Sequence, residues 1–403
     1  MSDARSAVLL GALLFAVYAA GACPTIYVGD SGELVTAVHL LGIPHPTGYP
    51  LYVLLGKLWT LLVPFGSIAW RMSLFSAACG AAACAALFYF LRRGLRLDRM
   101  AALLAALLLA FAPSFWAEAN VQRVYTLNAL FVVLGVQAAW RWHQQRTGAR
   151  LALAAFVCGL GATNHTFLAV EGLAIGVFAL ATEPALLRRP REILGAVAAG
   201  FAGLLPYLYL PLRSRADPRL DWGDPETLDR FLAVVLRRDF WGRAWLESPG
   251  DLATIAADWA RSLFLESAWA GPGLAALAIV AARRKSWPVL LPVLVMLANL
   301  GAVALHGSRS DLFIWHRYYI PSYAMLALLA GLGTQVLIER LPRAARLLPL
   351  AAAVFLLATG WSAFDRSRYR VAEAFAEEVL RSLPPGAHLS ASDDNILFTL
   401  LYL

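Results

Sequence analysis

Apolar runs long enough to cross a lipid bilayer recur along the whole chain of 403 residues. A spanning helix needs about 20 apolar residues, because the hydrocarbon core is about 30 Å thick and each residue rises about 1.5 Å. The composition is 60% hydrophobic and only 15% charged, against about 25% charged in a soluble domain, which excludes an ordinary soluble or disordered chain. We therefore predict an all-α polytopic membrane protein.

The runs predict about eleven spanning helices. The first run has the length of a signal peptide, but its basic flank is slight and no clear small-residue cleavage site follows it, so we interpret it as a helix. The short stretch 51–63 is expected to lie at the membrane interface. The predicted spans are residues 6–23, 67–91, 99–115, 122–140, 149–163, 166–182, 193–212, 264–282, 286–305, 318–338 and 347–363.

The arginines gather in short clusters that fall in every second connection between these runs. The positive-inside rule then places the N-terminus in the cytoplasm and the C-terminus outside. The net charge of +8 is accordingly a topology signal and not a nucleic-acid-binding surface. The clusters are Arg92, Arg93, Arg96 and Arg99; Arg141, Arg146 and Arg150; Arg188, Arg189 and Arg191; Arg283, Arg284 and Lys285; and Arg340, Arg343 and Arg346.

The unusual polar residues collect in the opposite, outer connections. Long polar loops on one side only are typical of an enzyme with an external site, whereas a transporter more often shows internal repeats, of which we find no convincing example. We therefore expect the chemistry on the extracytoplasmic side. The outer connections are 24–50, the turn around Glu118, the Asn164–His165 turn, 213–263, 306–316 and everything after residue 361.

No metal or other cofactor is expected. The four cysteines lie in or at the end of apolar stretches without CxxC spacing, which indicates neither a zinc site nor a disulfide framework. Asp221 and Asp224 are two close carboxylates. An isolated pair is weak evidence for a metal, and it equally indicates a turn before the amphipathic stretch 225–238.

Two carboxylates and two histidines lie a few residues beyond the first span. Asp30, followed three residues later by Glu33, predicts a capping box at the start of a short interfacial helix, which Gly42 and Pro44 end. A carboxylate beside a membrane is nevertheless unfavourable unless it is solvated or used. Asp30 and Glu33 are therefore candidates for chemistry as well as for capping, and His45 for a rigid turn between two prolines.

This loop also carries a family resemblance. Asp30-Ser-Gly-Glu33 followed by His45-Pro46-Thr-Gly48-Tyr49-Pro50 resembles the first-loop motif of the transmembrane protein 260 type of protein O-mannosyltransferase and its bacterial relatives. These enzymes belong to the GT-C superfamily of membrane glycosyltransferases. The similarity covers most of the first 230 residues and, more weakly, the rest; it runs through residues 70–76, 116–128, 161–165 and 207–213.

The resemblance implies a GT-C-like bundle with interfacial helices in the first outer loop. It also implies transfer of a sugar from a polyprenyl phosphate to an acceptor on the outer side, with a first-loop carboxylate near the reaction. Because the leaving phosphate is already a stable anion, such a site needs a base for the acceptor's proton and a cation for the phosphate. We expect Asp30 to be the base, and Glu33 to orient Asp30 or the acceptor.

Arg123 is the first candidate for the cation, because a charged side chain at the outer start of a span is either paired or functional. A structural ion pair between Arg123 and Glu118 is an equal alternative. Arg213 and Arg317, at the outer ends of two other spans, are further candidates, with snorkelling toward the interface as the alternative for each.

Four polar or aromatic residues complete the expected donor site. Asn164 and His165 form either a capping turn or a set of donors to phosphate and sugar hydroxyls. Tyr49 is either an aromatic-belt residue or a stacking partner for the sugar, and His45 lies four residues before it.

Two regions follow from this reading. Residues 1–363 are expected to form the catalytic membrane domain, and residues 364–403 an outer helix and the beginning of an outer domain, which relatives commonly continue. Only two lysines and abundant Ala, Leu and Arg suggest a high-GC bacterium, and hence a bacterial cytoplasmic membrane with an undecaprenyl-like lipid.

The leading hypothesis is an inverting transfer of a sugar, mannose by resemblance, to Ser or Thr of exported protein. The same chemistry on a glycan or lipid acceptor is a close alternative, and a transporter of lipid-linked sugar is an alternative of another class. The expected partners are a polyprenyl-phosphate-sugar donor, a protein or glycan acceptor and the bilayer, and no nucleic acid. Replacing Asp30 with Asn separates the classes, because only a catalytic base predicts a large loss of transfer with donor binding retained.

Overall fold

The computed structural model describes residues 2–242, 246, 248–282, 286–306, 315–340, 348–391 and 393–403. Across these residues the chain is helical, and its extended backbone pairs in a single isolated parallel bridge between Ile43 and Asp221. The predicted basic positions 283–285, 343 and 346 lie outside the described residues. The prediction of an all-α chain is confirmed.

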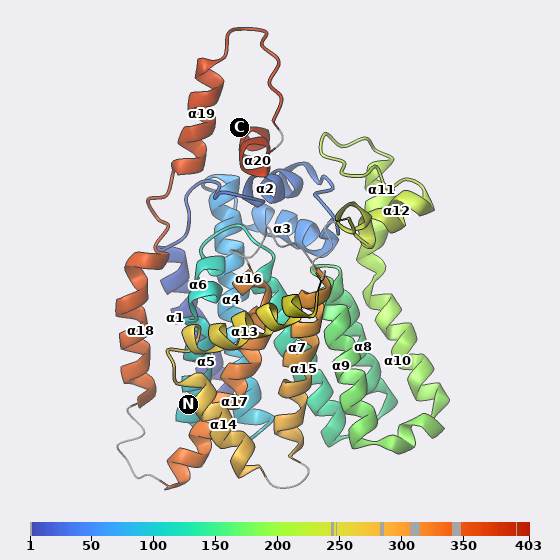
Figure 1. The fold of residues 1–403 in the computed structure, drawn as a ribbon, viewed down its shortest axis with the longest axis vertical. Helices are drawn as coiled ribbons and strands as arrows, with labels where there is room; N and C mark the ends of the chain where they lie inside the picture. Colours follow the sequence, from blue (N-terminus) through green and yellow to red (C-terminus); the bar gives the residue numbers. More distant parts are fainter. Residues whose placement is uncertain are drawn as a thin grey trace.

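Most of the long helices stand side by side in one bundle (Figure 1). The upright helices are α1 (Asp3–Ala20), α4 (Ile68–Arg93), α5 (Arg99–Ala110), α7 (Tyr125–Gln144), α8 (Gly148–Ala162), α9 (Phe167–Thr182), α10 (Pro190–Gly203), α14 (Gly271–Ala281), α15 (Trp287–His306), α17 (Ile320–Arg340) and α18 (Leu348–Phe364).

Shorter helices gather at one end of the bundle, which we call the loop end, and α13 crosses the face of the bundle below them (Figure 1). The loop end carries α2 (Ser31–Leu40), α3 (Pro50–Leu62), α11 (Tyr209–Ser214), α12 (Leu228–Val235), α19 (Val371–Ser382) and α20 (Asp394–Tyr402). The remaining helices are α6 (Pro113–Ala119), α13 (Pro249–Leu265), α16 (Trp315–Tyr318) and the 3-10 turns η1 (Pro184–Arg188), η2 (Leu205–Leu208) and η3 (Arg238–Phe240).

Among the described residues, five helices are long and apolar enough to cross a membrane on their own, or six if a bent pair counts as one span. The five are α1, α4, Pro190–Ser214, Trp287–Leu305 and α17. The predicted spans 149–163 and 166–182 coincide with shorter apolar helices, Gly148–Ala162 and Phe167–Thr182. The chain is thus a multi-pass membrane protein.

The predicted span 99–115 is not one straight helix. It consists of α5 and α6, which meet at an angle of 68°. Pro113 begins α6, and Ala112 before it has extended backbone angles, φ −60° and ψ 126°. Proline disfavours a helical conformation in the residue that precedes it, which explains the break. The bend brings the start of α7 and the loop before it to the loop end.

The predicted span 264–282 is too long at its N-terminal end. The helix α14 begins only at Gly271, because Ala268 and Trp269 adopt left-handed backbone conformations with φ values of 50° and 64°. Hydrophobic content alone did not reveal this turn, which separates α13 from the upright α14.

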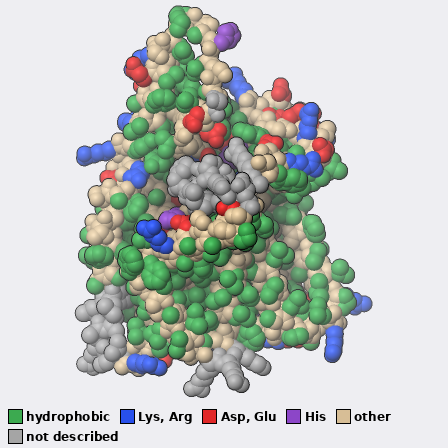
Figure 2. Space-filling view, in the orientation of Figure 1, with side chains coloured by type: hydrophobic (Ala, Val, Ile, Leu, Met, Phe, Trp, Pro, Cys, Tyr) green, Lys and Arg blue, Asp and Glu red, His purple; other side chains and the backbone are tan. Residues whose placement is uncertain are grey.

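Ion pairs join several of the basic clusters at the end of the bundle opposite the loop end. Asp3 of α1 pairs with Arg92, with a distance of 2.9 Å between Oδ1 and Nε. Glu183 at the end of α9 pairs with Arg146 and, at 3.5 Å, with Arg189. Hydrophobic side chains cover most of the lower part of the molecular face in Figure 2, and acidic side chains gather nearer the loop end. The ion pairs thus place arginines from three connections, Arg92, Arg146 and Arg189, at the same end of the bundle.

Candidate active site

Five segments far apart in the sequence meet at the loop end. They are the first outer loop with α2, the connection between α6 and α7, the turn between α8 and α9, the segment that follows α12, and α16. Electrostatic effects of Arg123, His45 and Arg317 on Asp30 place these predicted residues in one group. The site is therefore built by tertiary contacts around the start of α2.

Asp30 occupies the N-cap position of α2 and is half-buried. Its side chain makes no capping hydrogen bond, so the carboxylate is available for another role. Burial alone would raise the pKa of the Asp30 carboxyl, but the positive charges of Arg123, His45 and Arg317 lower it below its ordinary value. Asp30 is therefore ionised at neutral pH, as a base must be.

Glu33 does not complete the predicted capping box. Its fully buried carboxylate turns to His45 instead, accepting the backbone N–H at 2.7 Å and approaching the ring Nδ1 at 2.5 Å. The other ring nitrogen, Nε2, lies 2.9 Å from the Tyr49 hydroxyl. Burial lowers the pKa of His45, but the Glu33 carboxylate outweighs this effect and raises it. Glu33 thus fixes His45 and the turn that leads into α3.

Arg123 is 3% exposed and holds the first outer loop rather than Glu118. Its guanidinium donates to the Ser31 hydroxyl at 2.9 Å and to the Val28 carbonyl. Gly29 between them has φ +73°, and a Cβ there would lie 2.9 Å from the Arg123 Nη2 atom. Arg123 therefore supports the backbone that carries Asp30, and the expected pair between Arg123 and Glu118 does not form.

Arg317 is the partner of Glu118. Its Nε lies 3.7 Å from the Glu118 Oε1 atom, and its guanidinium carbon lies 5.7 Å from the centre of the Tyr125 ring. Burial lowers the pKa of Arg317, but Glu118 outweighs this effect and raises it. The guanidinium therefore stays charged and acts electrostatically on Asp30.

Asn164 and His165 lie in the turn between α8 and α9. The Asn164 amide donates to the Val124 carbonyl at 3.1 Å, which ties this turn to the start of α7. His165 is buried against the rings of Tyr125 and Phe167, at centroid distances of 5.7 and 4.6 Å. Burial, aided by nearby positive charge, lowers the pKa of His165 to about 3, so its imidazole is neutral. A neutral ring that accepts the Phe167 N–H at Nδ1 presents an N–H at Nε2.

Arg213 has a different place. Its Nε and Nη2 donate to the carbonyls of Leu41 and Leu40, at 2.7 and 3.1 Å. These carbonyls end α2, so Arg213 caps this helix at the end opposite Asp30. The structure brings Arg213 to the same helix as the predicted carboxylates, but with its donors directed to backbone.

Two residues that the sequence analysis missed belong to this region. Arg237, in a left-handed conformation after α12, exerts an electrostatic effect on His45, Tyr49 and His165, so it approaches the site from the long outer loop. Gln122 donates to the Thr25 carbonyl at 2.9 Å and thereby anchors the first outer loop. Neither residue belongs to a recognisable sequence motif. The only signal in the sequence is that Gln122 directly precedes the candidate Arg123.

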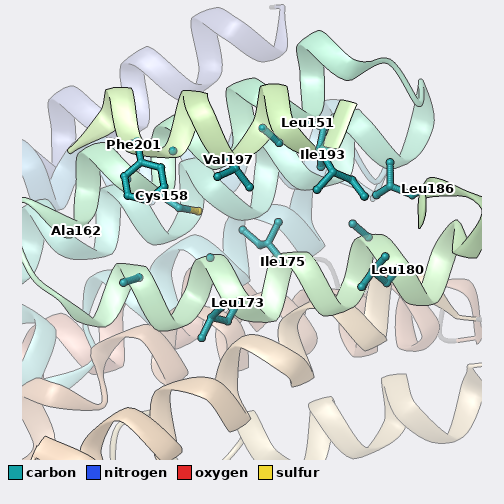
Figure 3. Close-up of a pocket in the computed structure, with 18 of the residues that line it drawn as sticks. Leu151, Cys158, Ala162, Leu173, Ile175, Leu180, Leu186, Ile193, Val197 and Phe201 are labelled. Carbon is teal, nitrogen blue, oxygen red and sulfur yellow. The ribbon is translucent and has the colours of Figure 1, made fainter. Parts of the chain in front are cut away.

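An apolar groove of about 580 Å³ lies between helices of the bundle (Figure 3). Helices α8, α9 and α10 line it, from Leu186 near the basic end to Ala162 beside the Asn164–His165 turn. Helices α8 and α10 touch along one side, since a Cβ at Gly159 would lie 2.1 Å from the Gly200 carbonyl oxygen. Leu173 and Phe201 on its walls are largely exposed, so the groove is open to its surroundings.

Residues 30–184 match the family model of the Protein O-mannosyl-transferase TMEM260 N-terminal domain. The Protein O-mannosyl-transferase TMEM260 of Mus musculus is 32% identical over an aligned length of 412 residues, which covers 95% of this chain and 58% of the mouse protein. The chain is thus similar to the TMEM260 type of protein O-mannosyl-transferase over nearly its whole length. The corresponding protein of Dictyostelium discoideum is 29% identical over 243 residues, 56% of this chain and 29% of that protein. The chain thus spans less than two thirds of the length of these TMEM260 relatives.

The fold of this chain is also found in solved structures. The crystal structure of ArnT from Cupriavidus metallidurans bound to undecaprenyl phosphate superposes with a TM-score of 0.61 at 18% identity, covering 98% of this chain and 74% of ArnT. The arabinosyltransferase EmbB from Mycobacterium smegmatis superposes with a TM-score of 0.52 at 16% identity, covering 89% of this chain and 33% of EmbB. The expected fold is therefore confirmed in its coarse form, as an all-helical, ArnT-like arrangement of the chain.

Proposed function

We propose that this chain is an inverting glycosyltransferase that moves a sugar, mannose in keeping with its similarity to TMEM260, from a polyprenyl phosphate to Ser or Thr hydroxyls of exported protein. The observation that carries the proposal is the Asp30 carboxylate, held ionised at the start of α2 beside Arg123, His45 and Arg317. The carboxylate makes no capping hydrogen bond and can therefore act as a base. The cations near it can stabilise a departing phosphate.

In the proposed reaction, Asp30 takes the proton of the acceptor hydroxyl as its oxygen attacks the anomeric carbon of the sugar. The bond between that carbon and the phosphate oxygen breaks, and the polyprenyl phosphate leaves with the electron pair. Arg317 acts electrostatically on Asp30, and its proposed role is to neutralise the growing negative charge. Arg237, which acts electrostatically on His45, approaches the same region from the long outer loop. The N–H of the neutral His165 ring is a donor to the phosphate or to a sugar hydroxyl.

Glu33, His45 and Tyr49 support this arrangement as a connected set. Because Glu33 is fully buried and bonded to His45, its proposed role is to hold the loop that follows α2 rather than to exchange protons with the acceptor. Arg123 has the matching role before α2, where it binds the Val28 carbonyl and the Ser31 hydroxyl.

The apolar groove between α8, α9 and α10 supports a lipid-linked donor. It is open to its surroundings and extends to Ala162, three residues before His165, so a polyprenyl tail lying in it would bring its phosphate toward the loop end. We further propose that the loop end faces the outside of a bacterial cytoplasmic membrane, since the basic clusters lie in the alternate connections.

The test is transfer by the purified protein. It is incubated with polyprenyl-phosphate-mannose and a pool of Ser- and Thr-containing peptides, and mass spectrometry detects a hexose adduct. We expect Asp30→Asn to lower transfer by about 10²- to 10⁴-fold while donor binding is retained. Glu226→Gln, a neutralised carboxylate at an exposed position of the long outer loop, is the matched control and should transfer normally.

Two outcomes would count against the proposal. Absence of any adduct with intact donor, across peptide, glycan and lipid acceptors, would contradict a transferase. Full turnover of the Asp30→Asn variant would show that Asp30 is not the base. Movement of lipid-linked sugar across the membrane of vesicles, without transfer to an acceptor, would identify a transporter instead.

A further inference from the structure

A second cluster of charged side chains lies behind Arg317. The short helix α16 carries both Arg317 and His316, and the two side chains meet different partners. The His316 Nε2 atom lies 3.4 Å from the Asp258 Oδ1 atom, and its Nδ1 atom lies 3.7 Å from the Glu266 Oε1 atom. The imidazole ring therefore lies between two carboxylates, one within α13 and one at its C-terminal end.

Glu266 connects this cluster to α6. Its carboxylate accepts the Ser114 N–H at 2.7 Å and the Ser114 hydroxyl at 2.5 Å, in the first turn of α6. One turn further along the same helix, Glu118 pairs with Arg317. Helix α16 is thus held against α6 twice, through His316 and Glu266 at one end and through Arg317 and Glu118 at the other.

We propose that His316 is a positioning residue for Arg317, and that the positive charge of its ring, maintained by Asp258 and Glu266, makes binding of a lipid-linked phosphate depend on pH. The inference rests on the proposed function, because it assigns the donor phosphate to Arg317. In this inference, His316 does not touch the donor. It positions α16, the helix that carries the proposed phosphate-binding residue Arg317.

The proton count of the ring explains this dependence. An imidazolium donates from both nitrogens and satisfies both carboxylates, whereas a neutral ring donates from one nitrogen only. Loss of the proton therefore removes the ion pair with Glu266, whose side chain is 3% exposed and then keeps only its hydrogen bonds from Ser114. One of the two contacts that hold α16 against α6 is thereby weakened, and with it the position of Arg317.

Among the described residues, the charged groups that face His316 are the carboxylates of Asp258 and Glu266, and both favour the charged ring. The ring of Tyr319 also lies nearby, with its centre 6.2 Å away. Hydrogen bonds to Asp258 and Glu266 outweigh burial and raise the pKa of His316 to about 9. The ring is charged at neutral pH, and its charge is lost as the pH rises through about 9.

The experiment measures binding of undecaprenyl phosphate to the purified full chain, together with the donor KM, between about pH 7.5 and 10. Over this range a phosphate monoester is already a dianion, since its second pKa is near 6. We expect the wild-type affinity to fall by roughly 5- to 10-fold as the ring deprotonates, at the low end of couplings between sites. Because Arg317 also neutralises the departing phosphate in the proposed reaction, the kcat at saturating donor should fall over the same pH range.

Three variants isolate the ring. His316→Gln should bind weakly throughout and show no such step, whereas Asp258→Asn should move the step to lower pH because it removes one of the two supporting charges. His388→Gln, at an exposed position of the C-terminal region, is the matched control and should behave as wild type. Size-exclusion chromatography checks that each variant is folded, and if His316→Gln is not, the shift in Asp258→Asn decides the question.

A His316→Gln variant with the wild-type affinity and pH step would overturn the inference, as would an unchanged step in Asp258→Asn. The two proposals fail in different ways. A pH step in lipid-phosphate binding without any transfer contradicts the transferase and retains the role of His316. Normal transfer with no effect of the three variants on binding contradicts only the role of His316.

Discussion

Filling the groove between α8, α9 and α10 should weaken a long-chain donor without harming the protein. Gly176 of α9 lines the groove, and a Cβ built there meets no atom within 4 Å. The Gly176→Leu side chain can therefore enter the groove without a clash. In a helix, glycine is about 1 kcal/mol less favourable than alanine or leucine, so the variant should be no less stable.

The expected size of the effect depends on where the displaced tail goes. Burial of a methylene group is worth about 0.8 kcal/mol only when the alternative is water. A polyprenyl tail leaves the groove for bilayer hydrocarbon, which is as apolar as leucine, so that term is absent. What remains is packing, about 0.1–0.2 kcal/mol per atom pair, and roughly ten lost pairs give about 1–2 kcal/mol. Because lipid contacts replace part of this loss, we expect the donor KM to rise by about 5- to 10-fold.

The assay compares two donors that differ only in tail length. Gly176 lies nine residues beyond Phe167, about 14 Å along α9 at 1.5 Å per residue. A donor with two isoprene units is too short to reach it, and its KM should not change. Gly195→Leu on α10 is the matched control, since a Cβ there also meets no atom within 4 Å and the residue does not line the groove. Equal effects on both donors, or in both variants, would refute the placement of the tail, as would unchanged kinetics with the long donor.

Three further outcomes test the first outer loop. Glu33→Gln breaks a buried pair and should lower unfolding stability by about 3 kcal/mol in a denaturation assay. Because the folded pKa of His45 is raised, this contribution is full below the unfolded pKa, about 6.5, and is lost as the pH rises through the folded value, so wild type and variant should converge at alkaline pH. Arg213→Met removes the cap of α2 and should speed amide exchange at that helix end; a large rise in donor KM would instead show phosphate binding. Gly32→Ala places a Cβ 2.0 Å from the Phe398 carbonyl oxygen, so limited proteolysis should cleave α20 faster than in wild type.

Local patterns were sufficient for the all-α fold class and for the position of α2. Asp30 is its N-cap residue, and the helix ends at Leu40, just before the predicted stop at Gly42. The break at Pro113 was also present in the sequence, but a continuous apolar run concealed it. Hydropathy reports how apolar a segment is and does not report its direction, so the bent pair α5 and α6 was predicted as one span.

The pairing of charges could not be predicted, because it depends on tertiary neighbours. Glu118 is five residues from Arg123 in sequence, but the bend before α7 directs Arg123 to the first outer loop, and Arg317 takes its place beside Glu118. Glu33 has the spacing of a capping box, but His45 returns to it through the turn after α2 and competes successfully for its carboxylate. The sequence therefore singled out Glu33, Glu118 and Arg123, but it did not reveal which partners these side chains meet.

The contact between α2 and α20 gives the site a position in the order of biosynthesis. The Asn395 side chain accepts the Gly29 N–H at 2.9 Å, across 366 residues of chain. At about 5–20 residues per second, a ribosome needs roughly 20–70 seconds to travel that distance. Throughout this interval the backbone beside Asp30 lacks its partner from α20. The segment that carries Asp30, the proposed base, is therefore made early, and its contact with α20 can form only after residue 395 has been made.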